Sequence, residues 1–328
     1  MARSADDALE SIRKLRERPL ADAAFVAELR GHLGSRHSLA VAKAARLASE
    51  RELAATLEAD LAAAFDRFAS NGSETDKGCH AKREIAEALQ TARAIAAPLF
   101  LRGVRLRQPE KAFGGPVDTA VGVRAACAMG LVRMHHPAAM DELAELLADP
   151  EPGGRLAAAR AIGYAEDRRG APLLRFKALS GDEDPAVTAE CVSGLLAMSP
   201  ESAVPFAARL LEASRDAALR ESVALALGES RRPEALEPLR AFYEASARRS
   251  AELRPTVLSA IALLRHDAAY DFLFATIEDG GAAEAADAVR ALFPFRADAG
   301  LAARARAAAA ERADAGRSLA PDLARLAP

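Results

Sequence analysis

The chain has 328 residues, of which 51% are hydrophobic, only 5% are aromatic and none is tryptophan. A core with so few aromatic side chains must be filled mainly by alanine and leucine, and this composition favours closely packed helices. The formal net charge is −3 at pH 7, so the chain as a whole has no net positive charge that would attract nucleic acid.

The first twenty residues, MARSADDALESIRKLRERPL, are charged and amphipathic, and they lack the apolar core of a secretory signal. No stretch approaches the roughly 18 apolar residues of a membrane span. We therefore predict a cytoplasmic protein without membrane segments, in which residues 1–18 form a cap or a frayed end. The three cysteines, Cys79, Cys127 and Cys191, are too few and too scattered for a disulfide framework.

The N-terminal third shows irregular helical patterns. One apolar stripe predicts a long helix, and its members are Leu53, Leu57, Leu61, Phe65 and Phe68. A second stripe begins with Ile85 and Leu89, after a polar loop at residues 70–80. Cys79 and His80 in that loop are adjacent, and no nearby ligand completes a metal site. We expect helical hairpins over residues 21–107 that are continuous with the part that follows.

A longer interruption, GVRLRQPEKAFGGPVDT, occupies residues 103–119. It holds Arg105, Arg107 and Phe113, and loops that depart from a repeat's minimal connector often carry function. The alternative is a simple linker in which Asp118 caps the next helix. Its glycines do not match a phosphate-binding loop.

From residue 118 onward a helical pattern repeats every 32 to 34 residues. Val123, Cys127, Leu131 and Met134 recur 64 positions later as Val187, Cys191, Leu195 and Met198. Three further copies are Leu219, Val223 and Leu227; Leu253, Val257 and Ile261; and Ala285, Val289 and Phe293. Leu156, Ala159 and Ile162 fill the gap between the first two copies with a slip of about one residue. At least six copies therefore occupy residues 118–311.

Each copy has a second apolar stripe and therefore two amphipathic helices. Capping residues precede prolines at Asp149, Asp184 and Ser199, as at helix starts. Gly130, Gly163 and Gly228 lie near the ends of first helices, where glycine closes a helix or permits tight packing. The sequence predicts an all-α solenoid with an irregular part at 1–117 and a regular array at 118–328. The stretch GLAARARAAAAERADAGRS is expected to be its final capping helix.

The segments RLAAARAIG...APLL and RESVALALGES...ALEPL resemble short HEAT-like repeats of the phycobilisome-lyase type. The resemblance covers about residues 118–311 and implies a right-handed superhelix of the armadillo type. It implies little about activity, because such repeats serve unrelated tasks. Bilin lyase activity would need chromophore-handling residues, and we identify none.

Two classes of HEAT-like enzyme are disfavoured by the residues. HEAT-repeat hydroxylases bind two irons through His-Glu motifs, and none of the six histidines is followed by glutamate. HEAT-like DNA glycosylases use a basic surface with aromatic residues, whereas this chain lacks tryptophan and is net negative. Cys127 and Cys191 share one position of the repeat, which indicates small core residues. We predict no catalytic residue, metal or cofactor.

The second helices of the repeats carry Arg175, Arg209 and Arg240, with Tyr243 and Tyr270 nearby. If second helices line the concave face, this row would grip an acidic peptide or phosphates. The alternative is that the arginines are unrelated and solvated, with their stems covering Ala-rich helices.

We expect a non-enzymatic scaffold or adaptor that binds another protein through its concave face and the 103–119 loop. The alternative is a nucleic-acid-binding or nucleic-acid-modifying HEAT protein that uses a local basic surface.

Overall fold

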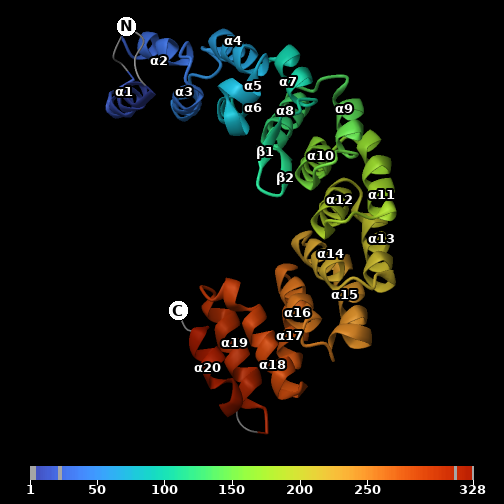
Figure 1. Ribbon diagram of the computed structural model, residues 1–328. Helices are drawn as coiled ribbons and strands as arrows, with labels where there is room; N and C mark the ends of the chain where they lie inside the picture. Colours follow the sequence, from blue (N-terminus) through green and yellow to red (C-terminus); the bar gives the residue numbers. More distant parts are fainter. Residues whose placement is uncertain (1–4, 21–23, 314–315, 327–328) are drawn as a thin grey trace. The chain divides into compact units, whose positions relative to one another are not determined.

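The computed structural model describes residues 5–20, 24–313 and 316–326 (Figure 1). The chain divides into two compact units, Met1–Ala165 and Glu166–Pro328. The sequence-based boundary after residue 117 falls inside the first unit. Residues 1–4 of the predicted N-terminal cap lie outside the described residues.

The first unit contains ten α-helices, one 3-10 helix (Lys77–Cys79) and one β-hairpin among its described residues. Their bounds are α1 (Ala5–Glu17), α2 (Phe25–Leu33), α3 (Ser38–Glu50), α4 (Glu58–Ala69), α5 (Gly72–Thr75), α6 (His80–Thr91), α7 (Ala97–Gly103), β1 (Pro109–Ala112), β2 (Gly115–Asp118), α8 (Val121–Arg133), α9 (Ala139–Leu146) and α10 (Pro152–Ala165). One layer is formed by α1, α3, α6, α8 and α10, each packed on the next.

All regular secondary structure in the described residues of the second unit is helical. Its α-helices are α11 (Ala171–Ser180), α12 (Pro185–Met198), α13 (Pro200–Ala213), α14 (Ala217–Glu229), α15 (Leu236–Phe242), α16 (Leu253–Leu263), α17 (Asp267–Asp279), α18 (Ala282–Ala291), α19 (Ala299–Ala310) and α20 (Ala320–Arg325). A π-helical segment, η4 (Tyr243–Ala247), follows α15 directly. The chain is an all-α solenoid of helical hairpins, interrupted by β1 and β2.

The predicted repeat forms the core. Val123, Cys127 and Leu131 are buried in α8, and their counterparts Val187, Cys191 and Leu195 are buried in α12. Close packing also explains one glycine: a Cβ atom on Gly228 of α14 would lie 2.2 Å from the carbonyl oxygen of Ala260 in α16. Glycine at this position therefore permits two neighbouring helices to approach.

Three sequence-based details were wrong. The predicted long helix over residues 53–68 begins only at Glu58, because the chain turns at Glu52 with φ of 59°. At the slipped copy of the repeat, the buried position belongs to Arg155 rather than Leu156, and its guanidinium donates to the carbonyl oxygens of Asp149 and Pro150. The expected final helix, α19, is followed by α20.

Candidate functional site

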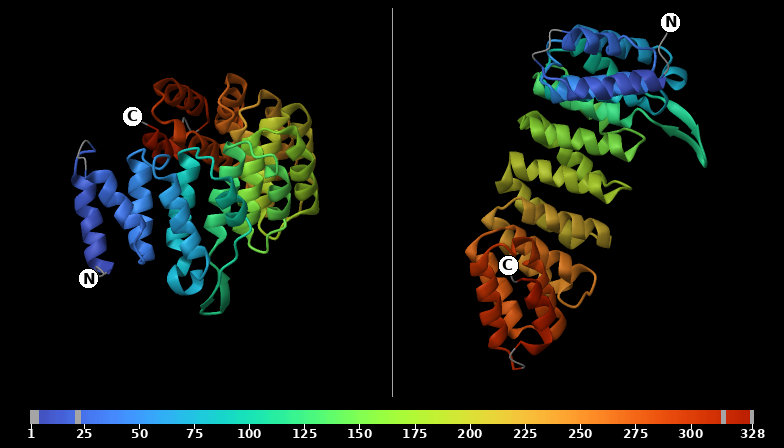
Figure 2. Two further views of the ribbon diagram at one scale, coloured as in Figure 1. Left: turned by 90° about the horizontal axis from the view of Figure 1, so that it is seen from above. Right: turned by 90° about the vertical axis from the view of Figure 1, so that its left-hand side faces the viewer.

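The interruption at residues 103–119 folds into an antiparallel hairpin of β1 and β2. Figure 2 shows this hairpin extending beyond the helices of its own unit. Ala112 pairs with Gly115, so Phe113 and Gly114 form the turn. Gly114 and Gly115 have φ of 95° and 128°, values that glycine adopts without strain. The turn places the Phe113 side chain in solvent with a relative exposure of 109%.

Prolines limit pairing along both edges of the hairpin. The Thr119 N–H donates to the Gln108 carbonyl oxygen at 3.0 Å, which identifies these two residues as a hydrogen-bonded pair. Hydrogen-bonded and non-hydrogen-bonded pairs alternate along antiparallel strands. The register therefore turns the nitrogens of Pro109 and Pro116 outward, where an edge strand would otherwise offer an N–H. The tip, rather than an edge, is the part of the hairpin suited to contact a partner.

A buried polar cluster fixes β1 to the loop before α6. The carboxylate of Glu110 on β1 accepts three hydrogen bonds at its Oε1 atom. The donors are the Gly78 N–H at 2.8 Å, Gln108 Nε2 at 2.6 Å and Thr119 Oγ1 at 3.0 Å. Partial burial raises the pKa of Glu110, but these hydrogen bonds outweigh burial and leave the pKa below its usual value.

The same cluster reaches an ion pair deep in the first unit. Gln108 Nε2 also donates to the Asp76 carbonyl oxygen at 2.9 Å. The Asp76 carboxylate accepts from Lys82 Nζ at 2.9 Å, and neither side chain has any exposed surface. The backbone N–H groups of Ala81 and Lys82 complete its hydrogen bonds at 3.0 and 3.1 Å. A buried pair that is fully hydrogen-bonded in this way fixes local geometry, because breaking either partner leaves an uncompensated charge.

A second buried network fixes β2 to α8. Asp118 Oδ1 accepts from the backbone N–H groups of Gln108 and Ala120. The N-cap residue of α8 is Ala120 and the helix has no side-chain cap, so the expectation that Asp118 caps this helix was wrong. The Asp118 Oδ2 atom accepts from the buried guanidinium of Arg124 at 2.7 Å. Burial raises the pKa of Asp118, and the backbone hydrogen bonds and Arg124 together lower it further than burial raises it.

Arg124 extends this network to the loop before α10. Its Nη2 atom donates to Asp149 Oδ1 at 3.1 Å, and Arg107 Nη1 donates to Asp149 Oδ2 at 2.5 Å. Arg105 makes two charge-assisted hydrogen bonds to the buried carboxylate of Glu142 in α9. Arg105 and Arg107, which the sequence suggested as partner contacts, thus bind carboxylates of their own chain while keeping part of their guanidinium surface exposed.

The sequence did not connect the four charged residues at the centre of these networks, and indicated Asp149 only as a helix cap. The four are Asp76, Lys82, Arg124 and Asp149. A signal existed for two of them. Lys82 lies three residues before Ile85 on the apolar stripe of its helix, and Arg124 follows directly after the buried Val123. A charged residue within a buried helical face needs a partner, and only the fold shows which one.

The predicted row of arginines lies on another layer than expected. Within residues 166–328, α12 packs closely on α14, and α14 packs closely on α16. In contrast, α11 and α13 have few direct contacts with each other (Figure 1). Helices on the inner side of a bend lie closer together than those on the outer side. The expectation that second helices line the concave face was therefore wrong within this unit, because α11, α13 and α15 carry Arg175, Arg209 and Arg240 on the outer side.

The structure does not bring these side chains together into one site. Arg175 lies over the ring of Phe206, with 4.6 Å between its Cζ atom and the ring centroid. It lines a cavity of about 660 Å³ with Arg168 and the first residues of α13. Arg209 is exposed on α13. Arg240 pairs with Glu237 one turn earlier at 2.9 Å.

The two tyrosines differ in accessibility. Tyr243 is only 2% exposed and packs edge-to-face on Phe272, with 5.5 Å between ring centroids. It is therefore not available as a broad surface contact. Tyr270 is half-buried and meets Phe295 edge-to-face at 6.1 Å. Burial raises the pKa of both phenols, that of Tyr243 to about 12.

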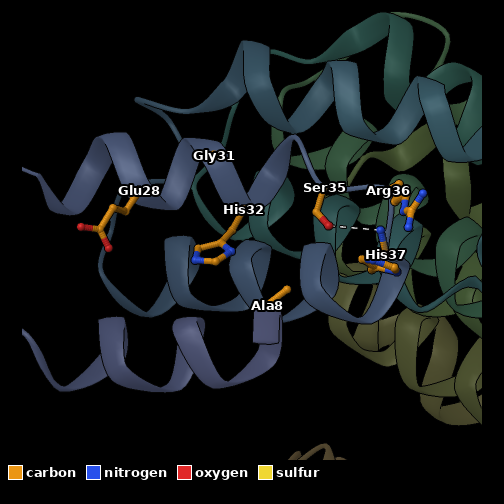
Figure 3. Close-up of a pocket in the computed structure, with 7 residues that line it drawn as sticks. All are labelled: Ala8, Glu28, Gly31, His32, Ser35, Arg36 and His37. Carbon is orange, nitrogen blue, oxygen red and sulfur yellow. Dashed lines mark hydrogen bonds between the residues drawn. The ribbon is translucent and has the colours of Figure 1, made fainter. Parts of the chain in front are cut away.

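A further cavity of about 450 Å³ lies between α1 and α2 (Figure 3). His32 is buried there, with Nε2 3.1 Å from the Ser11 hydroxyl. Figure 3 shows Glu28 and His37 on opposite sides of His32, so these three side chains do not converge. Among the described residues, no group of three or more His, Cys, Asp or Glu side chains is arranged to hold a metal ion.

The thiols are buried, as the repeat pattern indicates for Cys127 and Cys191. Burial raises the pKa of Cys79 and of Cys127, and it raises the pKa of Cys191 to about 12. Each of these groups is therefore held as a neutral thiol at neutral pH. No helix in the described parts of the chain is long and apolar enough to cross a membrane.

Comparison with known proteins identifies the repeats. A family model described as HEAT repeats matches residues 172–252, the stretch from α11 to just beyond η4. No curated protein sequence matches the chain. One similar solved structure is the complex of CpcE and CpcF of phycocyanin lyase from Nostoc sp. PCC7120, with 16% identity and a TM-score of 0.37 over 78% of this chain and 94% of that chain.

A second similar structure is human deoxyhypusine hydroxylase in complex with glycerol. It has 17% identity and a TM-score of 0.32, and the match covers 81% of this chain and 92% of that chain. HEAT repeats are thus identified over residues 172–252, within a chain whose described helices form a solenoid of hairpins.

Proposed function

We propose that this HEAT-repeat chain is a non-enzymatic scaffold that binds another protein, and that the tip of hairpin β1–β2 is a principal contact. The observation that carries the proposal is the complete exposure of Phe113 at the end of a hairpin that projects from its unit. Burying a phenylalanine side chain is worth about 1.5–3 kcal/mol. A pocket on a partner that encloses this ring would gain that free energy, and aromatic side chains are enriched at the centres of protein interfaces.

The anchoring of the hairpin supports the same function. Glu110 on β1 and Asp118 on β2 are each bound to buried side chains at the base of the hairpin. A contact held in place before binding loses little conformational entropy when the partner arrives. The two buried networks therefore hold the hairpin in place and keep Phe113 in position, although Phe113 itself is not part of the core.

The other partner contacts expected from the sequence are less well supported. The row of Arg175, Arg209 and Arg240 lies on the outer layer of its unit, so a concave-face contact would involve α12, α14 and α16 instead. Arg105 and Arg107 already bind carboxylates, and a phosphate would have to compete with them. We therefore do not propose the nucleic-acid alternative.

The test compares two exposed phenylalanines of one chain. Tagged wild-type protein, Phe113→Ala and Phe176→Ala are used for quantitative affinity capture from extract of the native cell at low and high salt. Phe176 on α11 is 73% exposed and serves as the matched control. We expect a defined protein to be captured by wild type and by Phe176→Ala, and to be lost with Phe113→Ala.

Equal capture by all three proteins would overturn the role of the hairpin tip. Loss with both variants would indicate non-specific adhesion to exposed aromatic rings and would also count against the proposal. Captured nucleic acid that is released at high salt, with no protein partner, would favour the nucleic-acid alternative.

A further inference from the structure

A cavity of about 660 Å³ in the second unit is lined by the start of α11, the end of α12 and the start of α13. Its apolar lining includes Pro172, Leu195 and Met198. Small-molecule sites are typically concave and mostly apolar, with volumes of about 300–1,000 Å³ and a few polar groups that orient the ligand. The cavity therefore has the size of a ligand site, and its charged side chains indicate which ligand it accepts.

Two arginines line this cavity from one helical face. Arg168 begins the 3-10 helix η2 (Arg168–Gly170), which continues directly into α11. Arg168, Pro172 and Arg175 therefore follow one another at the i, i+4 and i+7 positions of a helix. The Asp167 carboxylate, which is adjacent to Arg168 in the chain, pairs with Arg169 at 2.6 Å. Neither Arg168 nor Arg175 has a carboxylate partner among the described residues.

The guanidinium of Arg175 is held in place without the use of its hydrogen-bond donors. It lies over the Phe206 ring, with 4.6 Å between Cζ and the ring centroid. Stacking on an aromatic face leaves the N–H groups at the edge of the guanidinium available. Arg240, which also stacks on an aromatic ring, uses these groups to pair with Glu237. Arg175 makes no such bond to a described residue, and none of its nitrogens is enclosed, so its donors are open to the cavity.

The start of α13 adds polar groups to the lining. Ser199 is the N-cap residue, but its side chain makes no capping hydrogen bond, so its hydroxyl is available to a ligand. The N-terminal end of this 14-residue helix adds partial positive charge. Among the described residues, Glu201 is the only carboxylate that lines the cavity, and it is exposed. Two guanidinium groups thus face one carboxylate, and the cavity has a net positive charge.

We infer that this cavity, which we call the Arg175 pocket, binds a phosphate monoester that has an apolar organic body. Arg175 would donate to the phosphate oxygens, since the planar guanidinium fits phosphate geometry, and Arg168 would supply the second positive charge. The apolar body would pack against Leu195 and Met198. The ester could be supplied by a free small molecule or by a phosphorylated tyrosine side chain of another protein. This inference goes beyond the proposed function and is independent of it, because no residue of the hairpin takes part.

The experiment uses a methionine of the pocket as its reporter. Met198 is the only one of the chain's five methionines within residues 166–328. The full-length protein is labelled with ¹³C in the methionine methyl groups, and the Met198 signal is assigned with Met198→Leu. Phenyl phosphate is titrated at constant ionic strength and about pH 7.5, where the phosphate carries nearly two negative charges. Phenol is the neutral control. We expect the Met198 signal to shift and saturate at millimolar phenyl phosphate, whereas the other methionine signals stay in place.

A matched pair of arginine variants locates the phosphate. Arg175→Gln should weaken phenyl phosphate binding about tenfold or more, because a hydrogen bond between charged groups is lost. Arg209→Gln should leave the affinity unchanged, since Arg209 is exposed on α13 and does not line the pocket. No Met198 shift, an equal shift with phenol, or equal weakening by the two variants would overturn the inference.

Two variants at exposed positions test the charge of the pocket even if Arg175→Gln does not fold. Arg168→Gln should weaken phenyl phosphate binding about threefold, and Glu201→Gln should strengthen it about threefold, because exposed charges interact weakly. A purely structural role of Glu201 would not produce tighter binding. Changes of the same sign in the two variants would contradict a pocket that selects negative charge.

The source of the phosphate is distinguished in a further titration. A short glycine-flanked peptide with one phosphotyrosine is compared with phenyl phosphate. Affinity at least tenfold higher for the peptide would identify a phosphorylated protein side chain as the ligand. Equal or lower affinity would identify a free ester. Both outcomes require the Met198 shift, so both retain the phosphate site.

Discussion

Lys82 and Asp76 form an ion pair with 2.9 Å between Nζ and Oδ2, and both side chains are completely buried beneath the β-hairpin. The pair is joined to the hairpin through Gln108, whose side-chain amide binds both the Asp76 carbonyl and Glu110. Buried ion pairs contribute little net stability compared with apolar residues of the same volume, but the loss of one partner is costly. The Lys82–Asp76 pair therefore makes the conformation of residues 76–82 specific.

Replacement of Lys82 by methionine should destabilise the first unit by about 3–5 kcal/mol, because the Asp76 charge is left buried without its partner. The buried thiols report this change: Cys79 and Cys127 lie in the first unit, and Cys191 lies in the second. Thiol labelling in increasing urea, resolved by mass spectrometry, should show a lower midpoint for Cys79 and Cys127. Lys77→Met, at an exposed neighbour, is the control, and unchanged midpoints in Lys82→Met would contradict the prediction.

Stability should fall as the pH is lowered below about 5. Glu110 and Asp118 have folded-state pKa values below their ordinary values of about 4.3 and 3.9. The unfolded state therefore binds protons first on acidification, and the stabilisation present above the unfolded pKa is lost as the pH falls through the folded pKa. Urea unfolding from pH 7 to pH 3 should show this decline. Glu110→Gln should reduce stability at pH 7 and flatten the decline, whereas the exposed Glu145→Gln should follow the wild-type curve.

The repeat could be predicted from the sequence because burial follows helical periodicity, as Val123, Cys127 and Leu131 show. The hairpin could not, because PEKA and GPVD are short and contain residues that are uncommon in strands. Its conformation depends on hydrogen bonds from distant residues, such as that from Gly78 to Glu110. The sequence singled out Phe113 from its place in an interruption. It missed the anchor because partners such as Gly78 and Glu110, or Arg107 and Asp149, lie 32 and 42 residues apart.

Two glycines of the first unit should respond oppositely to alanine. A Cβ atom on Gly72 would lie 2.0 Å from Gln108 Oε1 and 2.8 Å from Lys82 Nζ, so Gly72→Ala must displace the buried cluster. We expect a loss of about 1–3 kcal/mol, the usual cost of overpacking. Gly31 in α2 has open space at the same position, and Gly31→Ala should be neutral or stabilise by up to about 1 kcal/mol. Urea midpoints measure both, and equal effects of the two variants would show that Gly72 is not sterically constrained.

The Tyr243 hydroxyl should make the protein less stable at alkaline pH. Its folded-state pKa of about 12 lies above the ordinary phenol value of about 10, so the unfolded state loses the proton first as the pH rises. Stability from this group is complete below about pH 10 and decreases above it. Absorbance titration of tyrosinate in wild type and in Tyr243→Phe should assign the highest-titrating phenol to Tyr243. Tyr270→Phe is the matched control, since the pKa of Tyr270 is also raised by burial. Persistence of that highest transition in Tyr243→Phe would show that the phenol with the highest pKa is not Tyr243.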